Sequence, residues 1–536
     1  MITNKPFASS KSGPSPATAA IWVDWLSVSF AVLTIVLGVA VAVSVGKFGA
    51  LALLAVPGAF LLVAALGLPE LGLMAFIAVT FTQLSNVGIT NYGLPSLAQP
   101  LAALLFLLIL LRITLYGERP LGWMRAGPIL LIYVLGWFAS LVHAGDFQVA
   151  SQTFVSFLKD ALGALIVVFF IQRPSSYRAA IWSLIAAGLF MATISAFQAL
   201  TGTYDNSYWG FGGWSSQVAG SIGRNRLQGP YANPNAFAQV LVVVVPLALD
   251  RVWHERRALL RLLAGWTFVS CVMVILFTYS RGGFLALLFT LGVLLIQYRP
   301  NFMPIMLTGV LLLGVLQFLP ATYTDRISTL TQFFSLQSSQ VSDPSFRGRL
   351  SENTAAWQMF VDHPLLGVGI GNYRINYQDY SRDIGLDPRR SSRTPASLYL
   401  ELLSEQGVVG ILIFFVLLLI VVRGLWVAKK QFTAARLDDQ AHLSAALLAG
   451  FAGYMFSAIF KNSAYSNVFW VIVGLAVAAG QVAWNEHQKK LETDAASSFD
   501  LPGQSSAVGD EPGDGLIPAG QSRFDLPDDS FGLQGL

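Results

Sequence analysis

Arginine and asparagine side chains gather just ahead of one of the apolar runs in this sequence. Arg224 and Arg226 are followed by Asn233-Pro234-Asn235 at the start of that run. Asn233 has an ordinary structural explanation, because asparagine caps helix N-termini and proline suits the first helical turn. The arginines are harder to explain, since a guanidinium group beside an apolar segment needs an anionic partner. Arg226 is therefore a candidate anion-binding residue, and Asn233 and Asn235 are candidate supporting residues.

A second arginine lies between two apolar runs that are joined by almost no loop. The connection reads Ser280-Arg281-Gly282-Gly283. Glycines permit a tight turn and a close approach to backbone N–H groups, which help to hold an anion. The alternative is that Arg281 only marks the end of a membrane span, with its charged end turned to water. Arg281 is the second candidate anion-binding residue, and Ser280 and Gly282 are candidate supports.

The third group of candidates lies in and after a long polar stretch, residues 320–397. Apolar residues recur at helical spacing between 350 and 361, which predicts an amphipathic helix lying along a membrane surface. His363 follows this helix, and Glu401 stands at the start of the next apolar run. Either side chain can take a proton from a hydroxyl group, although a histidine at this place also serves simply to end and pack a helix. Glu401 and His363 are the candidate catalytic residues.

We predict no cofactor, no metal and no nucleic-acid partner. The glycines of 367–371 resemble a nucleotide-binding loop, but a dinucleotide fingerprint needs a strand before it and a helix after it. Cys271 is the single cysteine, which excludes an intramolecular disulfide framework and a cysteine-ligated metal cluster. The net charge of +4 combines basic loops with an acidic tail and does not form a nucleic-acid-binding stripe.

The elements that position these residues must be membrane-spanning helices. Of the 536 residues, 54% are hydrophobic and only 12% are charged, and the mean hydropathy is +0.61. A soluble fold cannot bury that much apolar surface, whereas repeated runs of about twenty apolar residues each cross a bilayer as a helix. The predicted fold class is therefore an all-α polytopic membrane protein.

We predict about 12 to 14 spans. The apolar runs lie near residues 23–44, 49–67, 69–85, 97–113, 127–143, 154–172, 179–200, 234–250, 262–279, 282–298, 303–319, 407–427, 441–460 and 465–484. The corresponding regions are a cytoplasmic N-terminal segment (1–22), a first set of spans (23–319), a large outer loop (320–397), a second set of spans (398–485) and a disordered cytoplasmic tail (486–536).

The distribution of Lys and Arg predicts the orientation of these spans. Basic residues gather in alternate loops, and such loops remain cytoplasmic. This assignment puts both termini in the cytoplasm and the candidate residues on the outer face of a cytoplasmic (inner) membrane. Lys47 and Lys461 are the exceptions.

The tail contains a short repeat. Phe499-Asp500-Leu501-Pro502 recurs as Phe524-Asp525-Leu526-Pro527. It is either a docking motif for a cytoplasmic partner or a chance duplication in a segment of biased composition.

These motifs together resemble those of the O-antigen ligase and polymerase superfamily, membrane glycosyltransferases related to the lipopolysaccharide ligase. The resemblance covers about residues 220–415. It is carried by Arg226 with Gly229, by Asn233-Pro234-Asn235, by Ser280-Arg281-Gly282-Gly283, by Asp362-His363-Pro364-Leu365-Leu366-Gly367-Val368-Gly369, by Ser397-Leu398-Tyr399-Leu400 and by Glu405-Gln406-Gly407.

The resemblance implies a GT-C-like helical fold and a transfer reaction in cell-envelope or exopolysaccharide assembly. A glycan would pass from a polyprenyl diphosphate carrier, such as undecaprenyl diphosphate, to a hydroxyl group of a lipid or glycan acceptor, among membrane lipids and without a metal or nucleotide. It also implies that Arg226 and Arg281 hold the donor diphosphate.

One departure from the family pattern concerns the proton acceptor. The family's ligases have a histidine where this chain has Ala396, and alanine cannot take a proton. Either Glu401 or His363 replaces it, or the acceptor needs less activation, or the chain does not catalyse that transfer. The alternatives are a glycan polymerase and a non-catalytic or transport member. A transporter predicts ionisable residues along a path at mid-membrane, where only Lys159 and Asp160 lie, on different helix faces.

Overall fold

The computed structural model describes residues 68–117, 123–216, 225–298, 344–385, 393–462 and 466–499, with isolated positions between 303 and 313. The predicted N-terminal segment, the spans at 23–44 and 49–67, most of the span at 303–319, Arg224 and the tail beyond Phe499 lie outside these residues. Contacts divide the chain into a first unit that ends at Lys490 and a second that begins at Leu491. The features below belong to the first unit.

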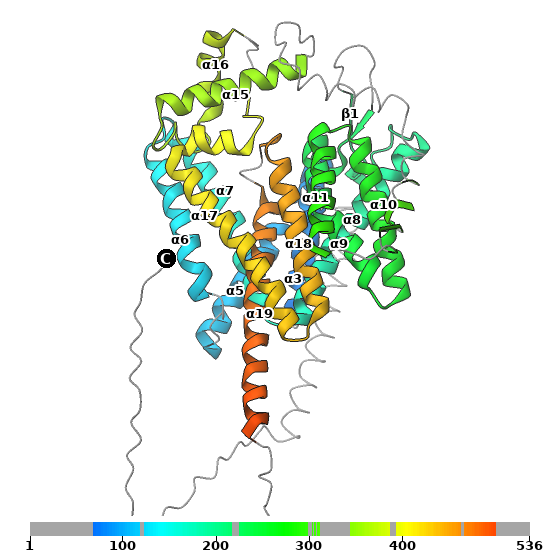
Figure 1. Cartoon of the computed structure of the whole chain (residues 1–536). Coiled ribbons are helices and arrows are strands. Elements are labelled where there is room, and N and C mark those ends of the chain that lie inside the picture. Colours follow the sequence, from blue (N-terminus) through cyan, green and yellow to red (C-terminus); the bar gives the residue numbers. More distant parts are fainter. Residues whose placement is uncertain are drawn as a thin grey trace, which may run out of the picture. The chain divides into compact units, whose positions relative to one another are not determined.

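The described part is helical apart from one small hairpin (Figure 1). The helices are α3 (Pro69–Phe81), α4 (Leu84–Tyr92), α5 (Ala98–Tyr116), α6 (Trp123–Val142), α7 (Phe147–Phe170), α8 (Pro174–Thr201), α9 (Pro234–His254), α10 (Ala258–Phe277), α11 (Arg281–Tyr298), α15 (Pro344–Asp362), α16 (Tyr373–Ile384), α17 (Leu398–Ala434), α18 (Asp438–Ser457) and α19 (Asn467–Phe499). Two short 3₁₀ turns, η1 (Tyr208–Gly210) and η2 (Gly229–Tyr231), flank an antiparallel pair of strands, β1 (Trp214–Ser216) and β2 (Asn225–Leu227).

The predicted fold class is confirmed. Among the described residues, eight helices are long and apolar enough to cross a membrane, and a ninth is obtained if the bent pair α3–α4 counts as one span. The sequence predicted a single span at 69–85, but α3 and α4 meet at an angle of 57°. The bend lies at Gln83, whose positive φ of 53° interrupts the helix.

Helix α9 lies at the centre of the packed helices. It contacts α8, α10, α11 and α18, and its Val-rich middle is completely buried. Its start follows from the sequence, because the Asn233 side chain accepts hydrogen bonds from the N–H groups of Asn235 (2.9 Å) and Ala236 (3.3 Å), and Pro234 occupies the first turn. The expectation that Asn233 caps this helix is confirmed.

Helices α15 and α16 pack on α17 at the end of the helix bundle where α17 begins (Figure 1). The predicted helix at 350–361 is α15, and its exposed face carries Leu350, Trp357 and Val361. Its other face packs against Tyr373 and Tyr377 of α16. The apolar face needed for a membrane-surface helix is therefore present, and the membrane contact itself stays a prediction.

A turn of 364–369 fastens these outer helices to a break in α17. Gly407 has a φ of 64°, and a Cβ atom there would lie 2.4 Å from the carbonyl carbon of Leu365. The backbone N–H of Val408 donates to Pro364, and that of Val368 donates to Ser404, both at 2.8 Å. Because glycine alone fits this approach easily, Gly407 fixes where α16 begins.

The predicted boundary of the disordered tail at residue 486 needs correction. Helix α19 continues to Phe499. Residues 486–495 lack an apolar face but are rich in Glu, Lys, Gln and Ala, which form helices readily. An ion pair between Lys489 and Glu486 at 2.6 Å adds local support.

Candidate functional site

A polar cavity of about 690 Å³ lies among helix ends that the predicted orientation puts on the outer face, and it is called the outer cavity here. Its walls come from α7, the first turns of α9, the start of α16, the first turns of α17, and the connection between α18 and α19. The charged side chains that line it are Asp160, Arg374, Glu401, Glu405 and Lys461. One of the two sequence candidates for catalysis, Glu401, is therefore a cavity residue.

The carboxylates of the cavity differ in their hydrogen bonds. Glu405 accepts from the N–H groups of Gly371 (2.9 Å) and Tyr373 (3.3 Å), so it holds the start of α16 in place. Glu401 is only 2% exposed and lies one turn earlier on α17. Asp160 has no hydrogen bond or ion pair within the part of the chain that the structure describes. A carboxylate in a polar cavity without such partners is available to a ligand.

Two cations face these carboxylates. The Arg374 side chain has no ion-pair or hydrogen-bond partner among the described residues. The Lys461 ammonium donates to the carbonyl oxygen (3.0 Å) and the side-chain oxygen (2.8 Å) of Asn462. Burial lowers the pKa of Lys461, and the nearby carboxylate of Glu401 partly offsets this. Both cations are placed to bind an anion that enters the cavity.

Arg226 lies beside this cavity. It is 8% exposed, its Nε donates to the carbonyl oxygen of Thr278 at 2.9 Å, and its Nη2 donates to the Asn235 side chain at 3.2 Å. The side chain thus joins β2 to the end of α10 and the start of α9, and the next residue along α9, Ala236, lines the cavity. Asn235 therefore contacts Arg226 directly, and its role as a support for an anion-binding arginine stays a prediction.

Arg281 opens α11, where Ser280 serves as the cap. The Ser280 hydroxyl accepts from the N–H of Gly283 at 3.1 Å. At Gly282 an added Cβ would lie 2.8 Å from the Cβ of Phe460, whose neighbour is Lys461. Gly282 therefore lets the connection that carries Lys461 approach the start of α11. The supporting residues of both arginines have local structural reasons for their identity.

The structure does not place Arg226, Arg281 or His363 among the residues that line the cavity. His363 is exposed at the end of α15 and is not among the residues that line the cavity. Ala396 is half-buried and its N–H donates to the Asn353 side chain at 3.2 Å. Position 396 follows shortly after the cavity residue Thr394 in the sequence. Its alanine side chain has no titratable group.

Sequence reasoning missed three of the cavity residues as site candidates. Asp160 was noted only as an isolated mid-membrane charge, and Lys461 only as an exception to the charge rule. Both signals were therefore in the sequence, because charges in such places are costly unless they serve a purpose. Arg374 belongs to a mixed polar helix, and nothing in its sequence context distinguishes it from a solvated arginine.

Fold and cavity together define a polytopic helical membrane protein with a charged cavity at one end of its helices. Residues 266–415 match the family model described as O-antigen ligase. This match confirms the resemblance and supports membership of the O-antigen ligase and polymerase family, membrane enzymes of glycan assembly. Searching the curated proteins gave no match. The matched range includes Arg281, Arg374, Glu401 and Glu405, whereas Asp160, Arg226 and Lys461 lie outside it.

Proposed function

We propose that this protein transfers a glycan from a polyprenyl diphosphate carrier to a hydroxyl acceptor at the outer face of the cytoplasmic membrane. The observation that carries the proposal is the outer cavity, whose lining combines the carboxylates of Glu401 and Asp160 with the cations of Lys461 and Arg374. The family match agrees with this reaction type. The proposal includes the identity of the glycan donor, of the acceptor and of the membrane.

On the donor side, the cations stabilise the leaving diphosphate. When the bond between the sugar C1 and the phosphate oxygen breaks, the diphosphate gains a negative charge. As the resemblance implies, Arg226 and Arg281 bind that charge, and Lys461 of the cavity lining adds a third cation. The reaction needs no metal for this purpose, because the arginines neutralise the diphosphate.

On the acceptor side, a carboxylate takes the proton. The acceptor oxygen forms a bond to C1 as its hydroxyl proton passes to the Glu401 carboxylate, so charge and protons balance. Glu401 is preferred to His363, because Glu401 lines the cavity and His363 does not. Glu401 also lies near the outer end of α17, at the depth expected for a diphosphate at the membrane surface. Asp160 is the second carboxylate available to the acceptor.

One observation favours a second function. Ala396 stands where the family's ligases have their histidine, which favours a non-catalytic member that binds lipid-linked glycans. A polymerase differs only in its acceptor, which would be a second glycan, and it would use the same donor residues.

The test is glycan transfer by the full chain, reconstituted in liposomes, from the polyprenyl-diphosphate oligosaccharide purified from its own host. Variants Arg281→Ala and Arg226→Ala should lose transfer, whereas Arg423→Ala, an exposed arginine of α17 outside the cavity, should retain it. Transfer by wild type that survives in both cavity-side variants would contradict the donor clamp. No transfer by wild type, with transfer gained in Ala396→His, would favour the non-catalytic function.

A further inference from the structure

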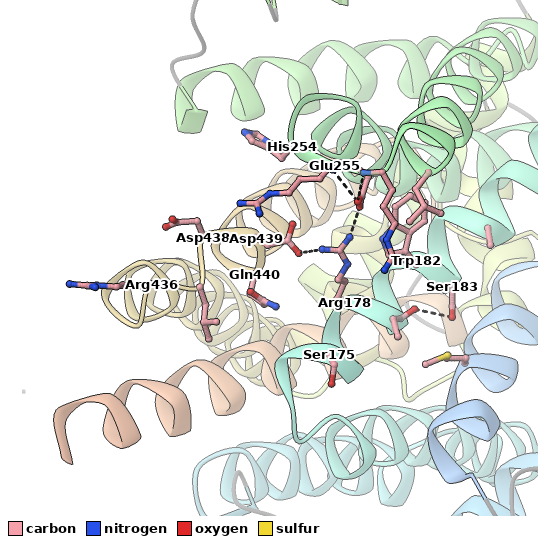
Figure 2. A pocket seen from close by; sticks show the side chains of 17 residues that line it. Ser175, Arg178, Trp182, Ser183, His254, Glu255, Arg436, Asp438, Asp439 and Gln440 are labelled. Carbon is pink, nitrogen blue, oxygen red and sulfur yellow. Dashed lines mark hydrogen bonds and ion pairs between the residues drawn. The ribbon is translucent and has the colours of Figure 1, made fainter. Parts of the chain in front are cut away.

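A second, larger cavity of about 920 Å³ (Figure 2) is lined by residues at the C-terminal end of α9 and at the starts of α8, α10 and α18. The two cavities lie at opposite ends of helix α9. Its first turn lines the outer cavity at Ala236, and its C-terminal end lines the second cavity at His254 and Glu255. The 21 residues of α9 separate the two cavities by roughly 30 Å. By the predicted orientation, the second cavity faces the cytoplasm.

The buried carboxylates of this inner cavity are already paired. Figure 2 shows Arg178 between Glu255 and Asp439, with ion pairs to both. Glu255 also accepts from the N–H groups of Arg256 (3.1 Å) and Arg257 (3.3 Å). These carboxylates hold protein groups and leave no acceptor for a ligand cation.

A metal site beneath the cavity does not fit the geometry. Asp250, His254 and His442 bring their donor atoms within 4.8 Å of one another. The two imidazole rings are stacked, however, 3.8 Å apart and tilted by only 12°, so their lone pairs do not converge on one point. Asp250 is in addition bound by Arg251 at 2.6 Å. This cluster is a neutralised ion-pair network.

The guanidinium groups at the rim of the inner cavity, unlike its paired carboxylates, lack side-chain partners among the described residues. Arg256, Arg257 and Arg436 line the cavity, are exposed, and have no side-chain partner within the described part of the chain. The opposing charge without a partner there is the exposed carboxylate of Asp438. Three unpaired cations against one anion give the rim a net positive charge.

The backbone adds to this preference. Helices α8, α10 and α18 all begin at this cavity, and none of the three has a side-chain hydrogen bond capping its first turn. Uncapped N–H groups at helix N-termini favour an anion. The walls also include Met74, Trp182, Ala186 and Leu260, an apolar surface that a free ion would not use.

We propose that the inner cavity binds a phosphate group, with Arg256, Arg257 and Arg436 as its ligands. A phosphodiester of an anionic lipid headgroup and a free phosphate ion share this chemistry. The lipid explains more of the cavity, because its glycerol and acyl carbons would cover the apolar wall while its phosphate meets the arginines. The site is independent of the glycan transfer proposed for the outer cavity.

The test measures binding of dioleoylphosphatidylglycerol to the full chain in a neutral detergent, by native mass spectrometry. Arg256→Ala/Arg257→Ala should weaken binding by about tenfold or more. Arg261→Ala/Arg423→Ala removes the same charge from exposed arginines outside the cavity and should change binding less than about twofold. Asp438→Asn should strengthen binding, which cannot result from a folding defect.

Three results would overturn the proposal: no retained phosphatidylglycerol on wild type, equal losses in both double variants, or no effect of either. A parallel arm identifies the source of the phosphate. If inorganic phosphate alone raises the unfolding temperature of wild type and not of Arg256→Ala/Arg257→Ala, the ligand is a free anion. If only the lipid does so, the ligand is a headgroup.

Discussion

The outer and inner cavities contain similar residues and use them in opposite ways. In the inner cavity, buried Arg251 is paired with Asp250 and Asp439, and Arg178 bridges Asp439 and Glu255. In the outer cavity, Asp160 and Arg374 have no such pairs within the described residues. Paired buried charges hold helix ends together, whereas unpaired charges in a cavity cost stability and are kept for a ligand. The comparison therefore separates the buried ion pairs of the inner end, which hold helix ends together, from the cavity charges without such pairs, which are Asp160 and Arg374 in the outer cavity and the exposed rim arginines in the inner one.

The largest effect should come from removing the proposed proton acceptor of the outer cavity. Glu401→Gln keeps the shape of the side chain but cannot take a proton, so turnover should fall by roughly 10²–10⁴-fold. The affinity for a polyprenyl diphosphate should stay unchanged, because Glu401 is not a ligand of the diphosphate. Single-turnover transfer and equilibrium binding of the carrier measure the two effects separately.

Asp160→Asn is the matched variant for that experiment. A loss of transfer in Asp160→Asn alone, with Glu401→Gln active, would assign the proton to Asp160 instead. Normal turnover in both variants would mean that neither carboxylate accepts the proton.

The next effect concerns the stability of the inner end. Arg251 is completely buried, and Arg251→Met would leave Asp250 charged in the interior. Breaking such a buried pair costs about 3–5 kcal/mol, which should appear as a clear drop in the thermal unfolding midpoint in detergent. Arg374→Met in the outer cavity should leave the midpoint unchanged, since Arg374 has no pair to lose in the described structure. Equal drops in both variants would remove the contrast between the two ends.

Much of this architecture was readable from apolar runs, and the exceptions have local causes. Helices α7 to α11 follow runs of apolar residues, and Asn233-Pro234 fixes the start of α9. The break at Gln83 was missed, because a positive φ at a non-glycine residue is set by packing and leaves no pattern in the sequence.

The site was predicted less well than the fold. Arg226 and Arg281 stay predictions as donor-binding residues. The cavity that Asp160, Arg374 and Glu401 share is formed by α7, α16 and α17, and α7 lies far from the other two in the chain. Spacing along a sequence carries no information about such a meeting of helices. The packing of these helices around the cavity depends on the turn at 364–369 and on its contact with Gly407.

A smaller effect should follow from filling the space at Gly282. Gly282→Ala would press against Phe460 and displace the connection that carries Lys461, which should cost about 1–3 kcal/mol and weaken carrier binding. Gly292→Ala is the control, because the same helix has open space there. Adding Phe460→Gly to Gly282→Ala removes the opposing Cβ atom and should restore part of the carrier affinity. A purely additive double variant would contradict the proposed contact.

The smallest effect is a pH dependence confined to the outer cavity. Burial lowers the pKa of Lys461, so the ammonium is charged at low pH and loses its proton at a lower pH than an exposed lysine would. Carrier binding should therefore decline as pH rises through that lowered pKa, by about tenfold at most. Lys461→Arg stays charged throughout and should remove the decline, which also controls for titration of the diphosphate itself. The same pH series with phosphatidylglycerol at the inner cavity, whose proposed ligands include no lysine, should be flat. A decline there too would show that the pH response is not specific to Lys461.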